Sequence, residues 1–174
     1  MRLGKVSLLL WLLTLQSCFI QPAGNKGIND SHLVFTAKVI RILDGDTMEV
    51  WYQDQPIKIR LAHIDCPEKR GHQPFGTKAK QALSHLCFGQ MVTVQGQKYD
   101  RYKRLIAVVI NDKKQVLNQE MIKQGMAWHF KKYSSDPLYA QLEINARQNK
   151  VGLWQEADAV APWDWRGTKH SLAK

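Results

Sequence analysis

Three acidic residues stand at the ends of predicted strands, where side chains from separate strands can converge on one point: Asp46, Asp65 and Glu68. Hard cations such as Ca²⁺ and Mg²⁺ prefer oxygen ligands from carboxylates, backbone carbonyls and water. These acids therefore supply the ligand types of a divalent-cation site. Asp-Gly-Asp at residues 44–46 is equally typical of a turn, and Asp65 of a solvated loop, so the acids alone leave both interpretations open.

Arg60 favours the cation site. The apolar residues at positions 57, 59 and 61 share one face of a strand, and Arg60 lies on the opposite face. It stands five residues before Asp65 at the end of the same strand, which places a guanidinium beside the proposed carboxylates. A second basic cluster falls between two predicted strands: Lys98, Arg101, Lys103 and Arg104. A solvated strand arginine and a solvated basic loop are the alternatives.

The elements that must position these residues follow from the sequence pattern. Short β-branched or alternating runs predict strands at residues 34–41, 47–52, 57–64, 91–98 and 105–111. Apolar residues at helical spacing predict helices at 77–87 and 117–124, and Asp136 followed by Pro137 begins a third. Five strands with helices inserted late predict an α+β fold, a five-stranded OB-type β-barrel with about three helices. Five tryptophans are expected to be core or packing aromatics and not base-stacking platforms: Trp51, Trp128, Trp154, Trp163 and Trp165.

Three sequence blocks carry a resemblance to a known family. Residues 42–47 (ILDGDT), 59–68 (IRLAHIDCPE) and 100–104 (DRYKR) resemble, in order and separation, the signature blocks of the staphylococcal nuclease-like (thermonuclease) family. Residues 124–128 (QGMAW) and 152–154 (GLW) are similar to later segments of the family, so the resemblance covers about residues 34–156. It implies a calcium-dependent phosphodiesterase that hydrolyses DNA and RNA, favours single-stranded regions, and cleaves P–O5′ bonds to leave 3′-phosphates.

The resemblance also implies a role for each acid. Asp46 and Asp65 correspond to carboxylate ligands of Ca²⁺, and the backbone carbonyl of Cys66 corresponds to a further protein ligand. The family varies at the position of Cys66, which is tolerable where only the main chain is used. Glu68 matches the residue that orients or deprotonates the attacking water.

Basic and aromatic residues complete the implied site. Arg60 and Arg104 correspond to the pair that grips the scissile phosphate, Tyr102 to a residue at the sugar or terminal phosphate, and Tyr133 to an aromatic against which a base stacks. One departure concerns Lys103, because the family usually has glycine there. If that position needs a positive φ, a lysine is strained or the loop is reshaped, which affects where Arg104 lies.

Length and charge narrow the remaining alternatives. A chain of 174 residues with 44% hydrophobic residues makes one domain, and a monomer is the default expectation. The formal charge of +10 describes a surface that attracts polyanions such as nucleic acid or anionic lipid headgroups. Two rival functions remain: a non-catalytic OB-fold nucleic-acid-binding module, and an envelope structural lipoprotein. The combined carboxylates and arginines favour the enzyme.

The first eighteen residues are typical of a signal peptide. Basic residues precede an apolar run at 6–15, which is too short to span a bilayer comfortably. Residues 15–18 (LQSC) resemble a bacterial lipobox that would lipidate Cys18, although Gln16 is uncommon at its place. The sequence predicts an exported protein, either an envelope lipoprotein held to the membrane by an N-terminal anchor or a freely secreted protein.

The rest of the chain divides into three parts. Residues 19–33 are predicted to be a flexible linker, 34–156 the thermonuclease-like domain, and 157–174 a C-terminal tail that packs back on the domain. Cys66 and Cys87 remain in the exported protein, and whether they pair is open at this stage. Their spacing matches no cysteine-based metal site.

Overall fold

The computed structural model describes residues 33–172, with side chains described through residue 167. Its elements follow in the order β1 (Leu33–Asp44), β2 (Thr47–Tyr52), β3 (Gln55–Leu61), β4 (Ile64–Asp65), α1 (Gly76–Cys87), β5 (Met91–Tyr99), β6 (Leu105–Ile110), α2 (Leu117–Lys123), β7 (Trp128–His129), α3 (Pro137–Gln148), the 3₁₀ helix η1 (Gly152–Gln155) and α4 (Pro162–Leu172). The predicted signal peptide, Cys18 and the linker up to residue 32 lie outside the described residues. Among the residues described, no helix has the length and apolar character needed to cross a membrane.

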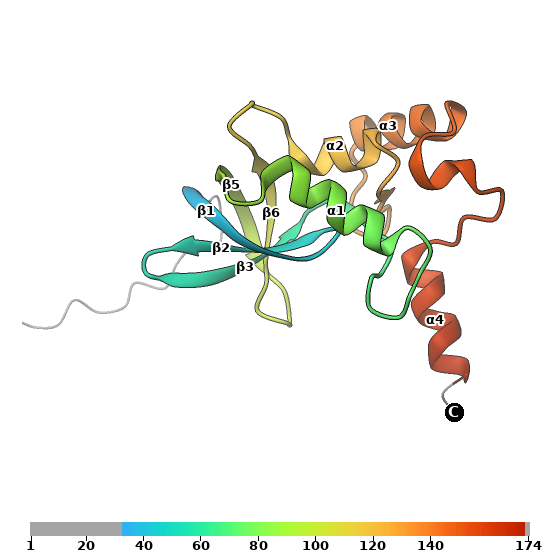
Figure 1. Ribbon diagram of the computed structural model, residues 1–174, viewed down its shortest axis with the longest axis horizontal. Coiled ribbons are helices and arrows are strands. Elements are labelled where there is room, and N and C mark those ends of the chain that lie inside the picture. The colour runs from blue at the N-terminus through green and yellow to red at the C-terminus, as the bar shows by residue number, and fades with distance from the viewer. Residues whose placement is uncertain (1–32, 173–174) are drawn as a thin grey trace, which may run out of the picture.

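Five strands close into a barrel in the order β1-β2-β3-β6-β5 (Figure 1). Neighbouring strands are antiparallel except β3 and β6, which run parallel with Arg60 opposite Ile106. The predicted α+β fold with a five-stranded OB-type barrel is confirmed. The third strand ends at Leu61 instead of residue 64, because the chain turns at His63, whose φ is 68°. It then forms the short strand β4, which pairs with β7.

The barrel interior is filled by alternate residues of its strands. Val39, Met48, Val50 and Ile59 are all completely buried, as expected for strands with one face toward a core. Trp51 follows Val50 on the opposite face of β2 and is 46% exposed, so of the two places expected for it the core is excluded. Successive side chains of a strand point to opposite faces, so Trp51 points outward when Val50 points into the barrel.

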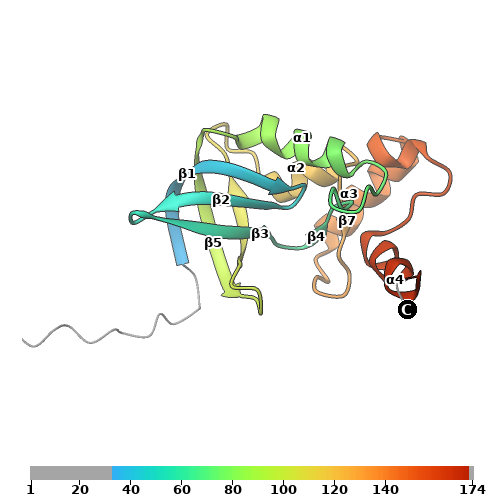
Figure 2. The same ribbon diagram turned by 60° about the horizontal axis from the view of Figure 1, so that its bottom comes forward.

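Helices α1 and α2 pack on the barrel, and α3 packs on α2 and β7 (Figure 2). Helix α1 buries Ala79, Leu83 and Cys87, the spacing that its sequence predicted. Helix α3 begins where Asp136 caps it, with the Asp136 carboxylate accepting a hydrogen bond of 2.8 Å from the Leu138 amide. Cys87 and Cys66 are both buried and free, so they do not form a disulfide in this structure.

The C-terminal segment forms a helix that the sequence analysis did not predict. Helix α4 lies at the end of the molecule away from the barrel, beside the loop that follows β4 (Figures 1 and 2). The Trp163 ring stacks on Phe130 with ring centroids 5.3 Å apart and meets Trp128 edge-on at 5.8 Å. Trp128 and Trp154 belong to a second, smaller hydrophobic cluster next to α3. The tail therefore packs on the domain, as expected, but as a helix.

Candidate active site

Two strand ends bring Asp46 and Asp65 together. Asp46 directly precedes β2, and its neighbour Thr47 pairs with Arg60 on β3. The turn after β3 leads into β4, whose last residue is Asp65. Both acids are buried, with exposed fractions of 7% and 1%.

Hydrogen bonds fix the Asp46 carboxylate in place. Its Oδ2 atom accepts from the backbone amide of Cys66 at 2.9 Å, and its Oδ1 atom accepts from the Thr47 hydroxyl at 2.9 Å. The turn can approach so closely because residue 45 is glycine: a Cβ there would lie 2.7 Å from the Cβ of Ala79 and 2.8 Å from that of Cys66. Gly45 is thus required by packing at the site.

Arg60 links the two carboxylates. Its Nη2 atom lies 2.7 Å from Asp65 Oδ1 and 3.1 Å from Asp46 Oδ2. Its Nη1 atom donates to the backbone carbonyls of Leu61 and Ile64, each at 3.0 Å. Burial alone would lower the pKa of Arg60, but the charges of the two carboxylates outweigh it and raise that pKa. The guanidinium is therefore charged and held rigidly.

The two buried carboxylates are stabilised by positive charge placed beside them. Burial, together with the charge of Asp46, raises the pKa of Asp65 to about 6 even though arginines lie beside it. The side-chain atoms here that could bind a metal ion are carboxylate oxygens, the ligands that Ca²⁺ and Mg²⁺ prefer. Among the described residues, no group of three or more His, Cys, Asp or Glu side chains could hold a metal. Two carboxylates are ligands of the type that a hard divalent cation prefers, although both Asp65 oxygens bond arginines in this structure, Arg60 at one and Arg166 at the other. The role of the Cys66 carbonyl stays a prediction.

A basic cleft opens beside these acids. Its volume is about 880 Å³, and Glu68 and Tyr102 lie in its wall. Cations from β3, from the loop after β4, from α1 and from the loop between β5 and β6 also line it: Lys58, Lys69, Arg70, Lys80 and Arg104. Clustered positive side chains in a concave surface attract a polyanion.

Arg104 lies in the cleft wall, and its ion pair is with Asp100. Asp100 holds it through contacts of 2.7 Å to Nη2 and 2.8 Å to Nε. The other Asp100 oxygen accepts from the backbone amides of Tyr102 at 2.9 Å and Arg104 at 3.0 Å. Lys103 has a φ of 59°, so this lysine adopts the left-handed conformation that favours glycine. The loop therefore keeps the glycine-type backbone and bears the strain.

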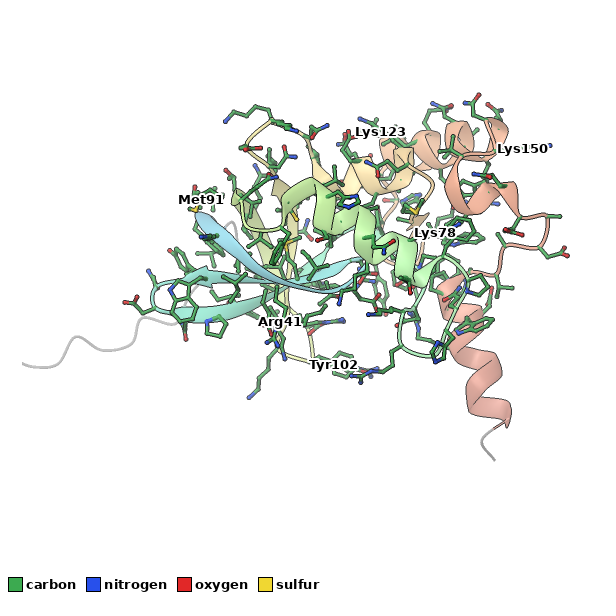
Figure 3. The ribbon with its side chains drawn as sticks, in the orientation of Figure 1. Arg41, Lys78, Met91, Tyr102, Lys123 and Lys150 are labelled. Atoms are coloured by element: carbon green, nitrogen blue, oxygen red, sulfur yellow. The ribbon has the colours of Figure 1, made fainter. Side chains whose placement is uncertain are left out.

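The two candidate substrate-binding tyrosines are exposed. Tyr102 is 62% exposed at the tip of the loop between β5 and β6 (Figure 3), with the guanidinium carbons of Arg101 and Arg104 4.8 and 5.4 Å from its ring centroid. Tyr133 is 70% exposed and meets Phe130 edge-on at 4.8 Å, but it does not line the cleft. The structure thus places Tyr102 at the site and Tyr133 outside it.

Comparison with known proteins agrees with this geometry. Residues 58–156 match the family model described as "Staphylococcal nuclease homologue". The chain belongs to the staphylococcal nuclease homologue family. It is 45% identical over 132 residues to a protein from Haemophilus influenzae named "Uncharacterized endonuclease", a match that covers 75% of this chain and 72% of that protein.

Two further relatives extend the comparison. An Escherichia coli protein, also named "Uncharacterized endonuclease", is 41% identical over 132 residues, covering 76% of this chain and 85% of its own. A Shigella flexneri protein named "Micrococcal nuclease" is 39% identical over 142 residues, covering 76% of this chain and 80% of its own. The family match ends at residue 156, so α4 lies beyond it.

The structure adds to this staphylococcal nuclease homologue site one residue that the sequence analysis missed. Arg166 of α4 places its Nη2 atom 2.7 Å from Asp65 Oδ2 and bonds Glu68 Oε1 through Nη1. Burial alone lowers the pKa of Arg166, but its bonds to Asp65 and Glu68 outweigh this and raise it. No spacing signal links residues 65 and 166, and the aromatic-rich segment 163–166 was the one available hint.

Proposed function

We propose that the protein is a calcium-dependent phosphodiesterase that hydrolyses DNA and RNA. The observation that carries this proposal is the convergence of Asp46, Asp65 and Arg60 within hydrogen-bonding distance, at the edge of a basic cleft that also contains Glu68. The names of the relatives, "Micrococcal nuclease" among them, support it. In this proposal Asp46, Asp65 and the Cys66 carbonyl hold the ion.

The chain's own residues account for the remaining chemistry. A water oxygen forms a bond to phosphorus, the P–O5′ bond breaks, and the departing 5′ oxygen takes up a proton, leaving a 3′-phosphate. Glu68 orients this water and accepts its proton. Arg60 and Arg104 donate hydrogen bonds to the phosphoryl oxygens, since their forked donors match phosphate geometry. Bound Ca²⁺ supplies a Lewis acid that neutralises charge developing on the phosphate.

The cleft favours a single strand over a closed duplex. Its basic lining follows a phosphate backbone, and the exposed ring of Tyr102 offers a surface for sugar or base. Tyr133 adds a second exposed ring against which a base stacks farther along. The protein acts as a monomer in this proposal, because one chain supplies every residue named.

A non-catalytic binding module accounts less well for the buried acids. Three carboxylates, those of Asp46, Asp65 and Glu68, face only two bonded arginines, Arg60 and Arg166, so the cluster repels a phosphate unless a further cation neutralises it. A module that binds nucleic acid by charge alone gains nothing from two buried aspartates. The envelope structural lipoprotein likewise gives them no role, although it accounts for the net charge.

We propose further that the protein is exported. Residues 1–18 serve as a signal peptide, with lipidation of Cys18 giving an envelope lipoprotein and ordinary cleavage giving a secreted one. Cys18→Ala separates these outcomes, because it should release a lipoprotein from the membrane fraction. An unchanged distribution between membrane and soluble fractions would argue against lipidation.

The test of the chemistry is digestion of denatured DNA, with analysis of the product ends. Wild-type protein with Ca²⁺ should leave 3′-phosphates. Glu68→Gln should still bind Ca²⁺ in a calorimetric titration but lose about 10²-fold to 10⁴-fold in turnover, the usual range for a general base. Full activity in this variant would remove Glu68 from the mechanism, and 5′-phosphate products would overturn the assigned bond cleavage.

A further inference from the structure

Helix α4 is fixed against the domain at its first turn. Ala161 and Pro162 are buried, and the Trp163 ring lies parallel to that of Phe130, with an interplanar angle of 2°. Trp163 also meets Trp128 of β7, the strand that pairs with Asp65. The helix therefore packs against the same short sheet that carries Asp65.

One buried glutamine joins α4 to the loop that carries Glu68. Gln73 is 5% exposed, and its Nε2 atom donates to the Val160 carbonyl at 2.8 Å. Its Oε1 atom accepts from the backbone amide of Glu68 at 2.9 Å. Val160, two residues before α4, and the backbone of Glu68 are thus bonded to the two polar atoms of one side-chain amide.

Arg166 follows Trp163 by three residues, so the two share a helix face. From this face its guanidinium forks between two acids, with Nη2 2.7 Å from Asp65 Oδ2 and Nη1 bonded to Glu68 Oε1. Arg60 occupies the other Asp65 oxygen, so each oxygen of that carboxylate has its own arginine. In the described part of the chain, Arg166 is the side chain that bonds the Glu68 carboxylate.

We propose that Arg166 is a positioning residue of the active site, which holds the Glu68 carboxylate beside Asp65 so that it faces the attacking water. The inference rests on the proposed function and extends it to a helix beyond residue 156. A glutamate side chain has several rotatable bonds, and on the partly exposed rim of a cleft it samples many orientations unless a partner restrains it. A planar, forked guanidinium restrains two carboxylates at once, and it does so with a more rigid geometry than an ammonium group.

A competing role makes the opposite prediction. If Arg166 instead acted as a tethered cation that excludes Ca²⁺ from Asp65, removing it would lower the Ca²⁺ concentration needed for activity. The maximal rate would then be unchanged or higher. The rate at saturating Ca²⁺ therefore distinguishes the two roles.

The experiment uses the full chain with denatured DNA as substrate, and Ca²⁺ saturation is established for each variant by calorimetric titration. Arg166→Gln should lower kcat by about tenfold to hundredfold at saturating Ca²⁺, the range expected for a misplaced catalytic group, with little change in KM. Arg166→Lys should recover part of the loss and tests the role even if Arg166→Gln undocks the helix. Lys123→Gln removes one surface charge and its partner contact with Glu120 on the far side of the molecule from Tyr102 (Figure 3), and it should leave activity unchanged.

A double variant separates positioning from general electrostatics. Arg166→Gln added to Glu68→Gln should cause almost no further loss, because the arginine acts through Glu68. A further loss as large as in the wild-type background would overturn the proposal, as would wild-type kcat in Arg166→Gln or a lowered Ca²⁺ requirement at undiminished kcat.

If the wild-type chain hydrolyses DNA and Arg166→Gln matches it, only this inference fails. If the wild-type chain does not hydrolyse nucleic acid with any divalent cation, the proposed function fails and this inference fails with it.

Discussion

Arg60 and Asp65 meet through an Nη2 to Oδ1 contact of 2.7 Å, although they lie on separate strands with a turn between them. The contact is sheltered from solvent, and the same Nη2 atom reaches Asp46. Arg60 therefore serves as a cation that joins two buried acids. In the proposed reaction the same guanidinium faces the phosphate.

Exchanging Arg60 for lysine should be costly. The ammonium group cannot keep the two carboxylates and the two carbonyls of the β3–β4 turn bonded together. We expect Arg60→Lys to lower kcat by about 10²-fold to 10³-fold, the loss typical of a donor to a developing charge. Arg147→Lys is the matched control, because Arg147 also pairs with a buried acid, Glu143, but on α3. Equal losses in the two variants would contradict the assignment.

Asp100 should support turnover through Arg104. It binds the Arg104 guanidinium and two backbone amides of its loop. Those hydrogen bonds lower the pKa of Asp100 despite the opposing effect of desolvation. Asp100→Asn should therefore reduce kcat by about tenfold, a partial misplacement of one phosphate donor. Asp112→Asn, in the turn after β6, is the control for loss of one exposed acid. A wild-type rate in Asp100→Asn would show that Arg104 needs no such support.

Lys103 should be a site where glycine stabilises the fold. Its φ of 59° is accessible to glycine without a Cβ penalty. Lys103→Gly should raise the free energy of unfolding by up to about 1 kcal/mol, since part of the gain is offset by the greater freedom of glycine in the unfolded chain. Lys98→Gly, in strand β5, should instead lower that free energy by about 0.5–1 kcal/mol. Denaturant unfolding measures both, and destabilisation by Lys103→Gly would contradict the strain.

Stability should fall in mild acid partly through His129. Its Nε2 atom lies 3.0 Å from the Ser134 hydroxyl in a buried position, and burial lowers the pKa of His129 below the usual value of about 6.5. The unfolded chain then binds a proton more readily than the folded chain. The contribution of neutral His129 to the free energy of unfolding is therefore complete above about pH 6.5, and it is lost as pH falls toward the folded-state pKa. Asp65, with its raised pKa, acts in the opposite direction. A comparison of unfolding free energies between wild type and His129→Gln isolates the histidine, and identical pH profiles would contradict the prediction.

The convergence of Asp46, Arg60 and Asp65 was predictable because it depends on local rules. Strand alternation puts Arg60 on the face away from the apolar residues, and the strand ends bring the two acids to one place. The resemblance to a family then assigned roles that spacing cannot assign. The predicted strand at 57–64 extends beyond the observed end at Leu61, because nothing in the pattern indicates the positive φ of His63.

Contacts between distant parts of the chain were not predictable in the same way. Arg166 reaches Asp65 across 101 residues, and it does so because Trp163 stacks on Phe130. No sequence period or motif links Arg166 to Asp65. Such relationships arise from tertiary packing, which one sequence does not encode in any local pattern.

The most direct test of the central claim is digestion of denatured DNA by the purified protein, with Ca²⁺ added and then removed by a chelator. We expect digestion to proceed with Ca²⁺, to stop on chelation and to resume when Ca²⁺ is restored, while Asp65→Asn stays slow at every Ca²⁺ concentration. Digestion that continues unchanged in the presence of chelator, or that survives Asp65→Asn at the wild-type rate, would contradict a divalent ion held by Asp46 and Asp65.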